Sequence, residues 1–258
     1  MFTDHPKCTQ VQEKIFIFKK FFDEETISKV NNLMKNPDYN QSDRNKKHTL
    51  EWFGYEKETP SIPEMLEIWE ALADLLYPEH VAHPQLGMMI NRAGEPGMFV
   101  HNDSPGRKMC NGNDHSACEI ESHDVWQTCC ILDYGIIAYF GEFTGGAVYY
   151  PHIRKDGSVM EADRDDKNCF EVQPEPGDVV IHAAYHPWEH GVRDVDTGIR
   201  FSFANFVLKR EENPGTFHNY KTPEYYEDVK GDLTQWVKPL VKNPLFDENG
   251  FRIIPHKK

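Results

Sequence analysis

Residues 176–208 read PGDVVIHAAYHPWEHGVRDVDTGIRFSFANFVL, and this stretch decides the predicted fold. Two apolar runs in it, Asp178–His182 and Ile199–Leu208, have the length and the β-branched and aromatic content that are typical of strands. Glycines that favour turns lie before and between them: Gly177, Gly191 and Gly198. The stretch therefore predicts two strands joined by a connection that is rich in histidine.

Short runs of the same kind continue upstream as far as residue 86. The further predicted strands are Leu86–Asn91, Met98–His101, Tyr134–Phe140, Ala147–Tyr150 and Cys169–Val172. Many short strands separated by turn residues are typical of a β-sandwich, a barrel or a jelly roll. We therefore expect a mainly β core over residues 86–208.

Two helices are predicted before this core. Asp23 is placed as an N-cap before an acidic first turn, and an apolar stripe follows it to Met34. A capping box, Ser61-Ile62-Pro63-Glu64, opens a second helix that stops before Pro78. Both helices are expected to buttress the core.

The 258 residues are expected to form a single domain with three parts. These parts are a helical N-terminal support over residues 1–85, the β core over residues 86–208 and a C-terminal wrap over residues 209–258. In the wrap, Thr222-Pro223 is a candidate helix start.

Composition and charge exclude several classes of function. The chain has 42 acidic and 28 basic side chains and a net charge of −14. Because phosphate contacts need clustered Lys and Arg, this balance argues against a nucleic-acid partner. No apolar run is long enough for a membrane span, and the start MFTDHPKCTQ does not have the pattern of a secretory signal. We therefore expect a cytoplasmic protein whose six cysteines are reduced.

The tripeptide His101-Asn102-Asp103 ends a predicted strand. In an extended chain residues i and i+2 point to the same side, so the imidazole and the carboxylate can hold one metal ion. A surface histidine near a turn aspartate is the competing explanation. Together with one of His182, His186 and His190, the pair gives two histidines and one carboxylate, a ligand set that suits non-haem Fe(II).

Arg200 lies in a strongly apolar predicted strand. A buried guanidinium is costly unless it is paired with an anion. Two explanations remain open from the sequence: a two-pronged contact to the carboxylate of a bound acid, or an internal salt bridge to one of the many acidic residues.

Taken together, these segments resemble the Fe(II)- and 2-oxoglutarate-dependent oxygenases, and within them the prolyl 4-hydroxylase-like branch. The motifs that carry the resemblance occur in the family's order over residues 86–208. They are His101-x-Asp103, GGAVYYP at residues 145–151, Pro176-Gly177-Asp178, His190-Gly191-Val192, and Arg200 ten residues after His190. The resemblance implies a double-stranded β-helix, or jelly roll, supported by N-terminal α-helices.

Residue by residue, the resemblance implies that His101, Asp103 and His190 bind iron. His190 is favoured over His182 and His186 by its distance from Arg200 and by its His-Gly-Val context.

The resemblance also implies a set of cosubstrate-binding residues. Arg200 would hold the far carboxylate of 2-oxoglutarate, and Ser202 and Tyr139 are further candidates for the same carboxylate. A strand serine bonded to the backbone and a core aromatic are their alternatives. Asn91 stands where relatives often carry a tyrosine near the cosubstrate, and Ala147 where the branch often has an acidic residue.

The implied reaction consumes 2-oxoglutarate and O2 at Fe(II), releases succinate and CO2, and hydroxylates a C–H bond, with ascorbate as an additional candidate cofactor. The best candidate substrate is a proline in a peptide or protein. A free amino acid or another small molecule is the alternative substrate, and a non-catalytic jelly-roll binding protein is the alternative of a different class.

The connection over residues 104–133 is long, which favours a functional role such as a lid. It contains Cys110, His115, Cys118 and His123, which are either reduced loop thiols with nearby histidines or a zinc site of unusual spacing. Four aromatic residues are either candidates for a peptide entrance or ordinary sheet and turn aromatics: Tyr149, Tyr150, Tyr185 and Trp188.

Overall fold

The computed structural model describes residues 1–36, 49–54, 63–76, 80–82, 85–101, 103, 132–159, 168–185 and 187–209. Its helices are a 3-10 helix η1 (Phe2–Asp4), α1 (Glu24–Leu33) and α3 (Pro63–Leu76). Its strands are β1 (Cys8–Gln12), β2 (Ile15–Phe18), β3 (Thr49–Gly54), β4 (His80–Ala82), β5 (Gln85–Arg92), β6 (Leu132–Gly145), β7 (Val148–Arg154), β8 (Cys169–Val172), β9 (Val179–Ala183), β10 (Gly191–Val192) and β11 (Val195–Lys209).

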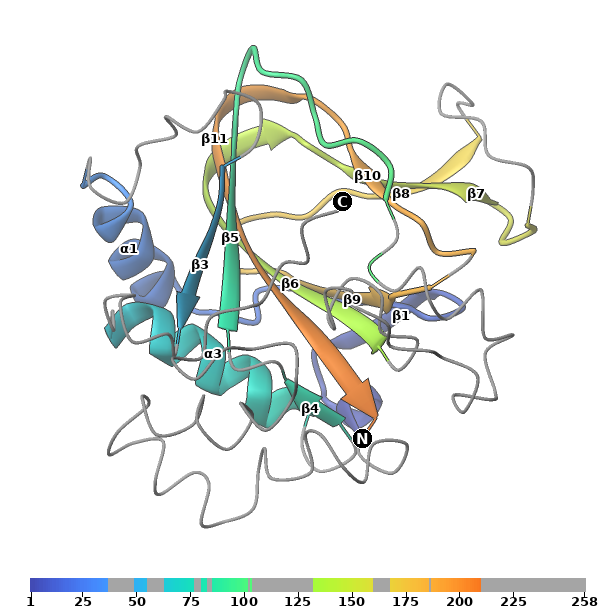
Figure 1. Cartoon of the computed structure of the whole chain (residues 1–258), viewed down its shortest axis with the longest axis horizontal. Helices are drawn as coiled ribbons and strands as arrows, with labels where there is room; N and C mark the ends of the chain where they lie inside the picture. The colour runs from blue at the N-terminus through green and yellow to red at the C-terminus, as the bar shows by residue number, and fades with distance from the viewer. Residues whose placement is uncertain are drawn as a thin grey trace, which may run out of the picture.

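Within the described ranges, these strands form two antiparallel sheets (Figure 1). The larger sheet has eight strands and runs β1-β2-β9-β6-β11-β5-β3, with β4 paired to the end of β11. The smaller sheet runs β10-β7-β8. The prediction of a mainly β jelly roll supported by N-terminal helices is confirmed.

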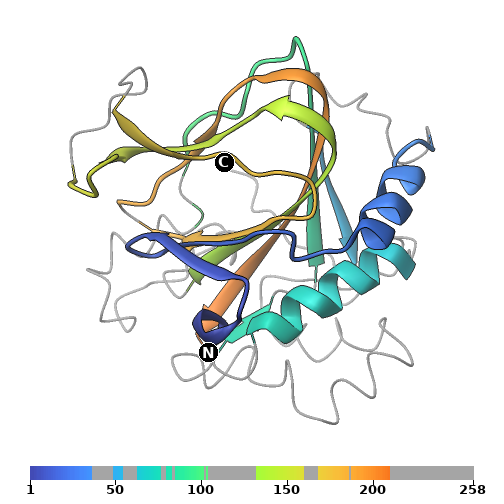
Figure 2. The same cartoon turned by 180° about the vertical axis from the view of Figure 1, so that it is seen from behind.

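Successive side chains of β6 point to opposite faces of the larger sheet, and both faces are packed. Ile136, Ala138 and Phe140 belong to one apolar cluster, and Ile137 and Tyr139 belong to another. The first cluster includes the buried side chains of α1 and α3, which lie together on one side of the sheet (Figures 1 and 2). The second cluster lies between the two sheets, because it also includes residues of β7 and β8.

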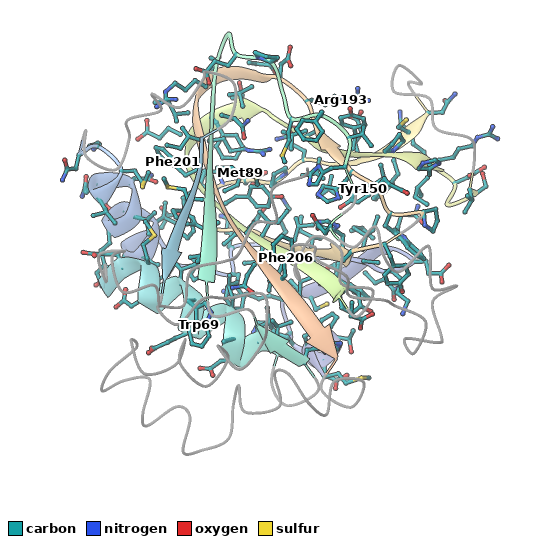
Figure 3. All side chains as sticks on the ribbon, viewed as in Figure 1. Trp69, Met89, Tyr150, Arg193, Phe201 and Phe206 are labelled. Atoms are coloured by element: carbon teal, nitrogen blue, oxygen red, sulfur yellow. The ribbon has the colours of Figure 1, made fainter. Side chains whose placement is uncertain are left out.

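The same division can be followed in the side chains. Trp69 and Phe201 belong to the cluster on the helix side, whereas Tyr150 belongs to the cluster between the sheets (Figure 3). Tyr139 and Tyr150 therefore lie in the space between the two sheets, where the candidate site is also found.

Local signals defined the first helix well. Asp23 is its N-cap, and the Asp23 carboxylate accepts a hydrogen bond from the Thr26 backbone N–H at 2.8 Å. Pro63 is the first residue of α3, where its missing N–H costs nothing. Ser61 and Ile62 of the predicted capping box lie outside the described residues.

Two predictions from the sequence need correction. Residues 1–85 are not only a helical support, because they also contribute β1, β2, β3 and β4. All four residues of β2 are buried, because Phe16 and Phe18 pack in the cluster on the helix side and Ile15 and Ile17 in the cluster between the sheets. The sequence of β2 therefore lacks the alternation that reveals a strand. Residues 98–101 do not form a strand; of these, His101 makes an isolated bridge to His190.

The predicted C-terminal wrap lies outside the described residues from residue 210 onward. In the described ranges, no helix combines the length and the apolar character that a membrane crossing requires. The division of the chain into one domain with three parts stays a prediction.

Candidate metal centre and anion pocket

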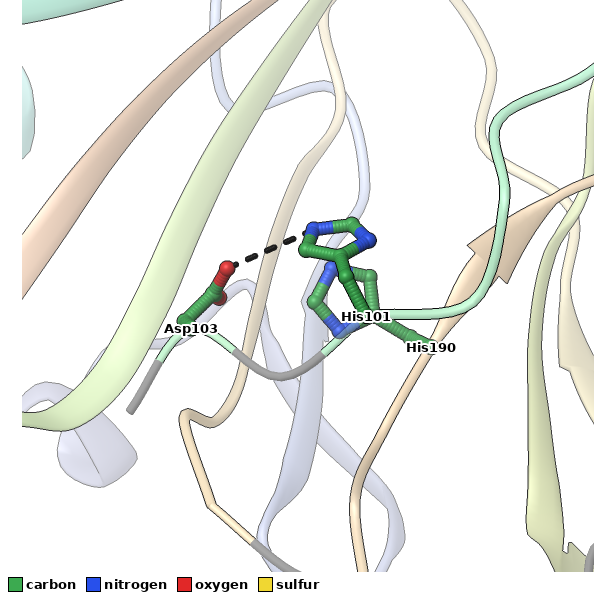
Figure 4. Close-up of side chains that lie close together, drawn as sticks. All are labelled: His101, Asp103 and His190. Atoms are coloured by element: carbon green, nitrogen blue, oxygen red, sulfur yellow. Dashed lines mark ion pairs between the residues drawn. The ribbon is translucent and has the colours of Figure 1, made fainter. Parts of the chain in front are cut away.

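His101, Asp103 and His190 come together although 86 residues lie between the second and the third. The His101 and His190 backbones form a short antiparallel bridge, with N–H to carbonyl distances of 3.0 and 3.1 Å. One candidate ligand atom from each of the three side chains lies within 4.8 Å of the other two. Figure 4 shows the three side chains facing one another, with the His101 Nε2 to Asp103 Oδ1 distance of 3.4 Å marked.

A hydrogen bond at Nδ1 orients the His101 ring so that its Nε2 lies near Asp103. Its Nδ1 lies 3.1 Å from the Phe99 carbonyl oxygen, and since a carbonyl only accepts, Nδ1 carries the hydrogen. Such a bond to the far nitrogen is the usual support of a metal-binding histidine. Burial lowers the pKa of His101, but the hydrogen bond and the charge of Asp103 outweigh it, so that the pKa is raised.

His190 behaves in the opposite way. Its ring is buried, and its centroid lies 4.3 Å from that of His101. Burial, and then the neighbouring His101, lower the pKa of His190 well below its ordinary value. His190 is therefore neutral at physiological pH, which is the state in which a histidine binds a metal.

Arg200 is a buried cation without a carboxylate partner among the described residues. Its side chain is 1% exposed, and its guanidinium donates to the Gly146 carbonyl and, at 3.2 Å, to the Asn91 side-chain oxygen. Its Nε has no hydrogen-bond partner in the described chain. The internal salt bridge that the sequence left open is absent from this part of the protein, so the cost of burying the charge still calls for an anion.

Two further donors accompany Arg200. The hydroxyls of Tyr139 and Ser202 are buried, and the described residues provide neither with a hydrogen-bond partner. The Arg200 guanidinium lies over the Tyr139 ring, 5.4 Å from its centroid. Burial raises the pKa of Tyr139, so its hydroxyl stays protonated and can donate.

Strand register explains why these groups share one face. Ser202 of β11 pairs with Tyr139 of β6, and Arg200 of β11 pairs with Asn91 of β5. Residues 200 and 202 point to the same side of β11, and residue 139 points between the sheets. Unsatisfied buried donors around a guanidinium form a site for a carboxylate.

Tyr150 connects the two groups of residues and was missed as a buried site residue. The sequence suggested a place at a peptide entrance, but Tyr150 is fully buried, and its hydroxyl has no partner within the described ranges. Its ring centroid lies 6.2 Å from that of His190. Burial, and then Tyr139 and Asp103, raise the pKa of Tyr150, so its hydroxyl stays protonated. The only signal in the sequence was its place before Pro151 in the GGAVYYP motif.

His182, which the sequence offered as an alternative third ligand, is a second buried polar group beside the proposed metal ligands. It is 0% exposed, and its ring meets the His190 ring edge to face with centroids 4.0 Å apart. Burial, and then His190, lower the pKa of His182 to about 3, so this ring is neutral. Its place opposite Gly135 on β6 depends on strand pairing, which the sequence does not reveal.

Gly135 makes room for the metal centre. A Cβ at this residue would lie 2.8 Å from Asp103 Oδ2 and 3.2 Å from His182 Nε2. Any larger residue would therefore push against the carboxylate and the buried ring at the same time.

Several predicted residues remain without a structural account. His186 and the four candidate zinc ligands Cys110, His115, Cys118 and His123 lie outside the described residues. Ala147 is buried, and nothing in the described structure explains why an acidic residue is missing there.

The donor set fits a specific kind of metal chemistry. Two imidazoles and one carboxylate on one side of a metal leave coordination positions open, and this set suits ferrous iron in oxygen-activating enzymes. The buried donors of Arg200, Tyr139 and Ser202 on the same inner face suit a ligand with a carboxylate at its far end. The site can therefore hold a metal ion together with a carboxylic acid.

Comparison with known proteins supports the fold. No family model and no curated protein matches the chain. Among solved structures, it is similar to a prolyl hydroxylase from Trichoplax adhaerens in complex with a hypoxia inducible factor oxygen degradation domain peptide fragment. That likeness has a TM-score of 0.51 and 11% identity over 77% of this chain and 85% of that one.

Two other solved structures give lower scores. The viral collagen prolyl hydroxylase of Paramecium Bursaria Chlorella virus-1, in its 2OG complex, has a TM-score of 0.46 and 10% identity over 76% of this chain and 96% of that one. A Pseudomonas putida prolyl-4-hydroxylase has a TM-score of 0.45 and 10% identity over 76% and 92%. The fold assignment rests on the Trichoplax structure: the chain has the jelly-roll fold of a prolyl hydroxylase.

Proposed function

We propose that this protein is an Fe(II)- and 2-oxoglutarate-dependent dioxygenase that hydroxylates a C–H bond, with a proline in a peptide as substrate. One observation carries the proposal. A cluster of two histidines and one aspartate lies in the same jelly-roll interior as a buried arginine that has no carboxylate partner among the described residues. Tyr150 packs in one cluster with Tyr139, and its ring lies near that of His190.

His101, Asp103 and His190 are the proposed iron ligands. His190 is already neutral, and the Phe99 carbonyl fixes the His101 ring, so little rearrangement is needed on binding. Bound iron would supply O2 activation coupled to the loss of CO2 from 2-oxoglutarate. The protein's residues position the reactants and exclude water.

Arg200, Tyr139 and Ser202 are the proposed holders of the far carboxylate of 2-oxoglutarate. Each offers a buried donor that the described chain leaves unsatisfied. Asn91 takes a supporting role, because its side-chain oxygen accepts from the Arg200 guanidinium and so orients it. Tyr150 adds a donor between this pocket and the metal ligands.

Two observations favour a peptidyl proline as substrate. The Trichoplax prolyl hydroxylase was solved in complex with a peptide fragment. In this chain Phe99 is 63% exposed, and its ring centroid lies 5.7 Å from that of the proposed ligand His101. An exposed aromatic ring beside the metal suits an apolar ring such as that of proline.

The reaction class is tested by succinate formation. Purified protein supplied with Fe(II), 2-oxoglutarate, O2 and ascorbate should release succinate in the presence of a pool of proline-containing peptides. Asp103→Ala should abolish release, and the metal-free protein should keep the wild-type circular dichroism spectrum. Undiminished succinate release by Asp103→Ala would refute the metal assignment, and absence of both 2-oxoglutarate binding and succinate in the wild type would favour a non-catalytic binding protein.

The substrate is tested by mass spectrometry. We expect a gain of one oxygen atom on proline in a peptide, and Phe99→Ala should raise the KM for that peptide with little change in kcat. If the oxygen atom appears only on a free amino acid or another small molecule, the reaction class stands and the peptide assignment fails.

The role of Arg200 is tested by its conservative variant. Arg200→Lys keeps the charge but loses the two-pronged geometry, so the Kd of 2-oxoglutarate should rise by at least about tenfold. Ser202→Ala removes one neutral donor and should raise the Kd by about two- to tenfold. An unchanged Kd in Arg200→Lys would place the carboxylate elsewhere.

A further inference from the structure

His182 is a buried polar side chain that the proposed reaction does not use. It lies on β9, directly opposite Gly135 of β6, and its ring packs edge to face against His190. Its Nε2 has no hydrogen-bond partner in the described part of the chain. A buried polar atom without a partner calls for an explanation.

The other ring nitrogen determines what Nε2 can do. Nδ1 lies 3.3 Å from the Ala183 carbonyl oxygen, which can only accept, so the hydrogen of the neutral ring is on Nδ1. Nε2 therefore carries a lone pair and is an acceptor.

A second acceptor lies close to this lone pair. Asp103 Oδ2 and His182 Nε2 are 2.8 and 3.2 Å from the same point, the place that a Cβ of residue 135 would occupy. The two atoms are not hydrogen-bonded to each other, and two acceptors cannot be. A water molecule has two hydrogens and can donate one to each.

We propose that His182 is a positioning residue of the metal centre, which acts by holding a water molecule between its Nε2 and Asp103 Oδ2. This inference rests on the proposed metal site. The water fixes Oδ2 on the Gly135 side and leaves Oδ1, which lies 3.4 Å from His101 Nε2, for the metal. Hydrogen bonds that orient a ligating carboxylate in this way commonly change metal affinity by about 10- to 100-fold.

The proposed water bridge also requires that residue 135 has no side chain. A side chain at residue 135 would press on both acceptors, whereas Gly135 leaves Asp103 Oδ2 and His182 Nε2 accessible to a bridging water. A role in packing alone would not explain a buried acceptor nitrogen that has no partner in the described chain and lies near the carboxylate of a proposed ligand.

The test measures binding of Co(II), a spectroscopic substitute for ferrous iron, to the full chain without cosubstrate. His182→Leu keeps a buried apolar volume and removes the acceptor, whereas His182→Gln returns an acceptor oxygen. His5→Leu makes the same substitution at a histidine that packs on Phe18 and Phe21, away from the site. The readouts are the Kd of Co(II), its visible absorption spectrum and the unfolding temperature of the metal-free protein.

We expect His182→Leu to raise the Kd of Co(II) by about tenfold or more, His182→Gln to recover most of the loss, and His5→Leu to leave the Kd unchanged. A His182→Leu Kd within twofold of wild type, or a Gln variant as weak as the Leu variant, overturns the inference while the proposed function stands. If wild-type protein does not bind Co(II), the proposed metal centre fails and the inference fails with it. A purely structural histidine would change the unfolding temperature and leave the Kd and the spectrum as they are.

Discussion

His101 and His190 face the same point, yet their pKa values move in opposite directions. The Asp103 carboxylate favours the protonated form of His101 against the effect of burial, whereas burial and His101 favour the neutral form of His190. In the metal-free protein, acid therefore adds a proton to His101 first. A metal ion must displace that proton before it can bind.

Metal affinity should consequently depend on pH through one proton. Below the raised pKa of His101, the association constant of Mn(II) or Co(II) should rise about tenfold per pH unit, and above that pKa it should be constant. His190 adds no dependence near neutrality because its pKa is lowered. Competition titrations between about pH 5 and 8 measure the slope, and a constant affinity over that range would contradict the proposed role of His101.

Adding a single methyl group at Gly135 should also change the metal affinity. Gly135→Ala would place its Cβ 2.8 Å from Asp103 Oδ2, closer than real contacts allow, so the carboxylate must turn away. We expect metal affinity to fall by at least tenfold, measured by Co(II) titration.

The matched control for Gly135→Ala is Gly94→Ala. The added methyl group meets nothing within 4 Å, but the residue has a φ of +83°, so this substitution should lower stability and leave metal affinity as it is. Equal Co(II) affinities for wild type and Gly135→Ala would contradict the placement of Asp103.

At the scale of elements, the turn before β9 connects the end of β2 to β6. Asp178 is fully buried, and its carboxylate accepts from Lys19 Nζ at 2.7 Å and from the backbone N–H groups of Lys20 and Glu175 at 2.9 and 2.8 Å. The backbone of the same turn exchanges two hydrogen bonds with Tyr139. The Pro-Gly-Asp motif thus fixes β2 and the strand that carries a proposed cosubstrate residue.

Asp178→Ala should lower the free energy of unfolding by about 3 kcal/mol, because the Lys19 ammonium and two backbone N–H groups lose a buried acceptor. Asp178→Asn keeps one acceptor oxygen and should lower the free energy of unfolding by less than Asp178→Ala. Urea unfolding measures both, with Asp156→Ala as the control, since the exposed Asp156 makes similar bonds to Ser158 in a surface turn. Comparable losses at residues 156 and 178 would contradict this role for the buried turn.

Such local motifs are the part of the fold that sequence can predict. The cap at Asp23 and the strand Cys169–Val172 were predicted within a residue because a few neighbouring side chains determine them. The strand Ile15–Phe18 was missed because it is buried on both faces. The positions of His182 and Gly135 beside Asp103 follow from strand pairing across the sheet, which no local pattern contains.

At the scale of the whole molecule, the jelly roll buries polar groups that its own described chain leaves unsatisfied. Arg200 and the hydroxyls of Tyr139, Tyr150 and Ser202 all lie in the interior. A buried cation without an anion destabilises a protein, so the ligand-free state is expected to be less stable than the same fold with an apolar residue at position 200. At residue 200, the charge that is proposed to bind the cosubstrate therefore lowers the stability of the ligand-free protein.

Thermal unfolding can separate the cost of the buried Arg200 charge from the stabilisation that bound 2-oxoglutarate provides. In the absence of ligand, Arg200→Met should unfold at or above the wild-type temperature, because the cost of the buried charge exceeds the two hydrogen bonds to Gly146 and Asn91. With Mn(II) present, adding 2-oxoglutarate at a hundred times its Kd should stabilise wild type by about a further 2.7 kcal/mol, a shift of several degrees. Arg200→Met should gain only the part that comes from Mn(II), since its metal ligands are intact. A ligand-free Arg200→Met protein that unfolds well below wild type would mean that the guanidinium is already compensated within the fold, and the anion pocket would then have another explanation.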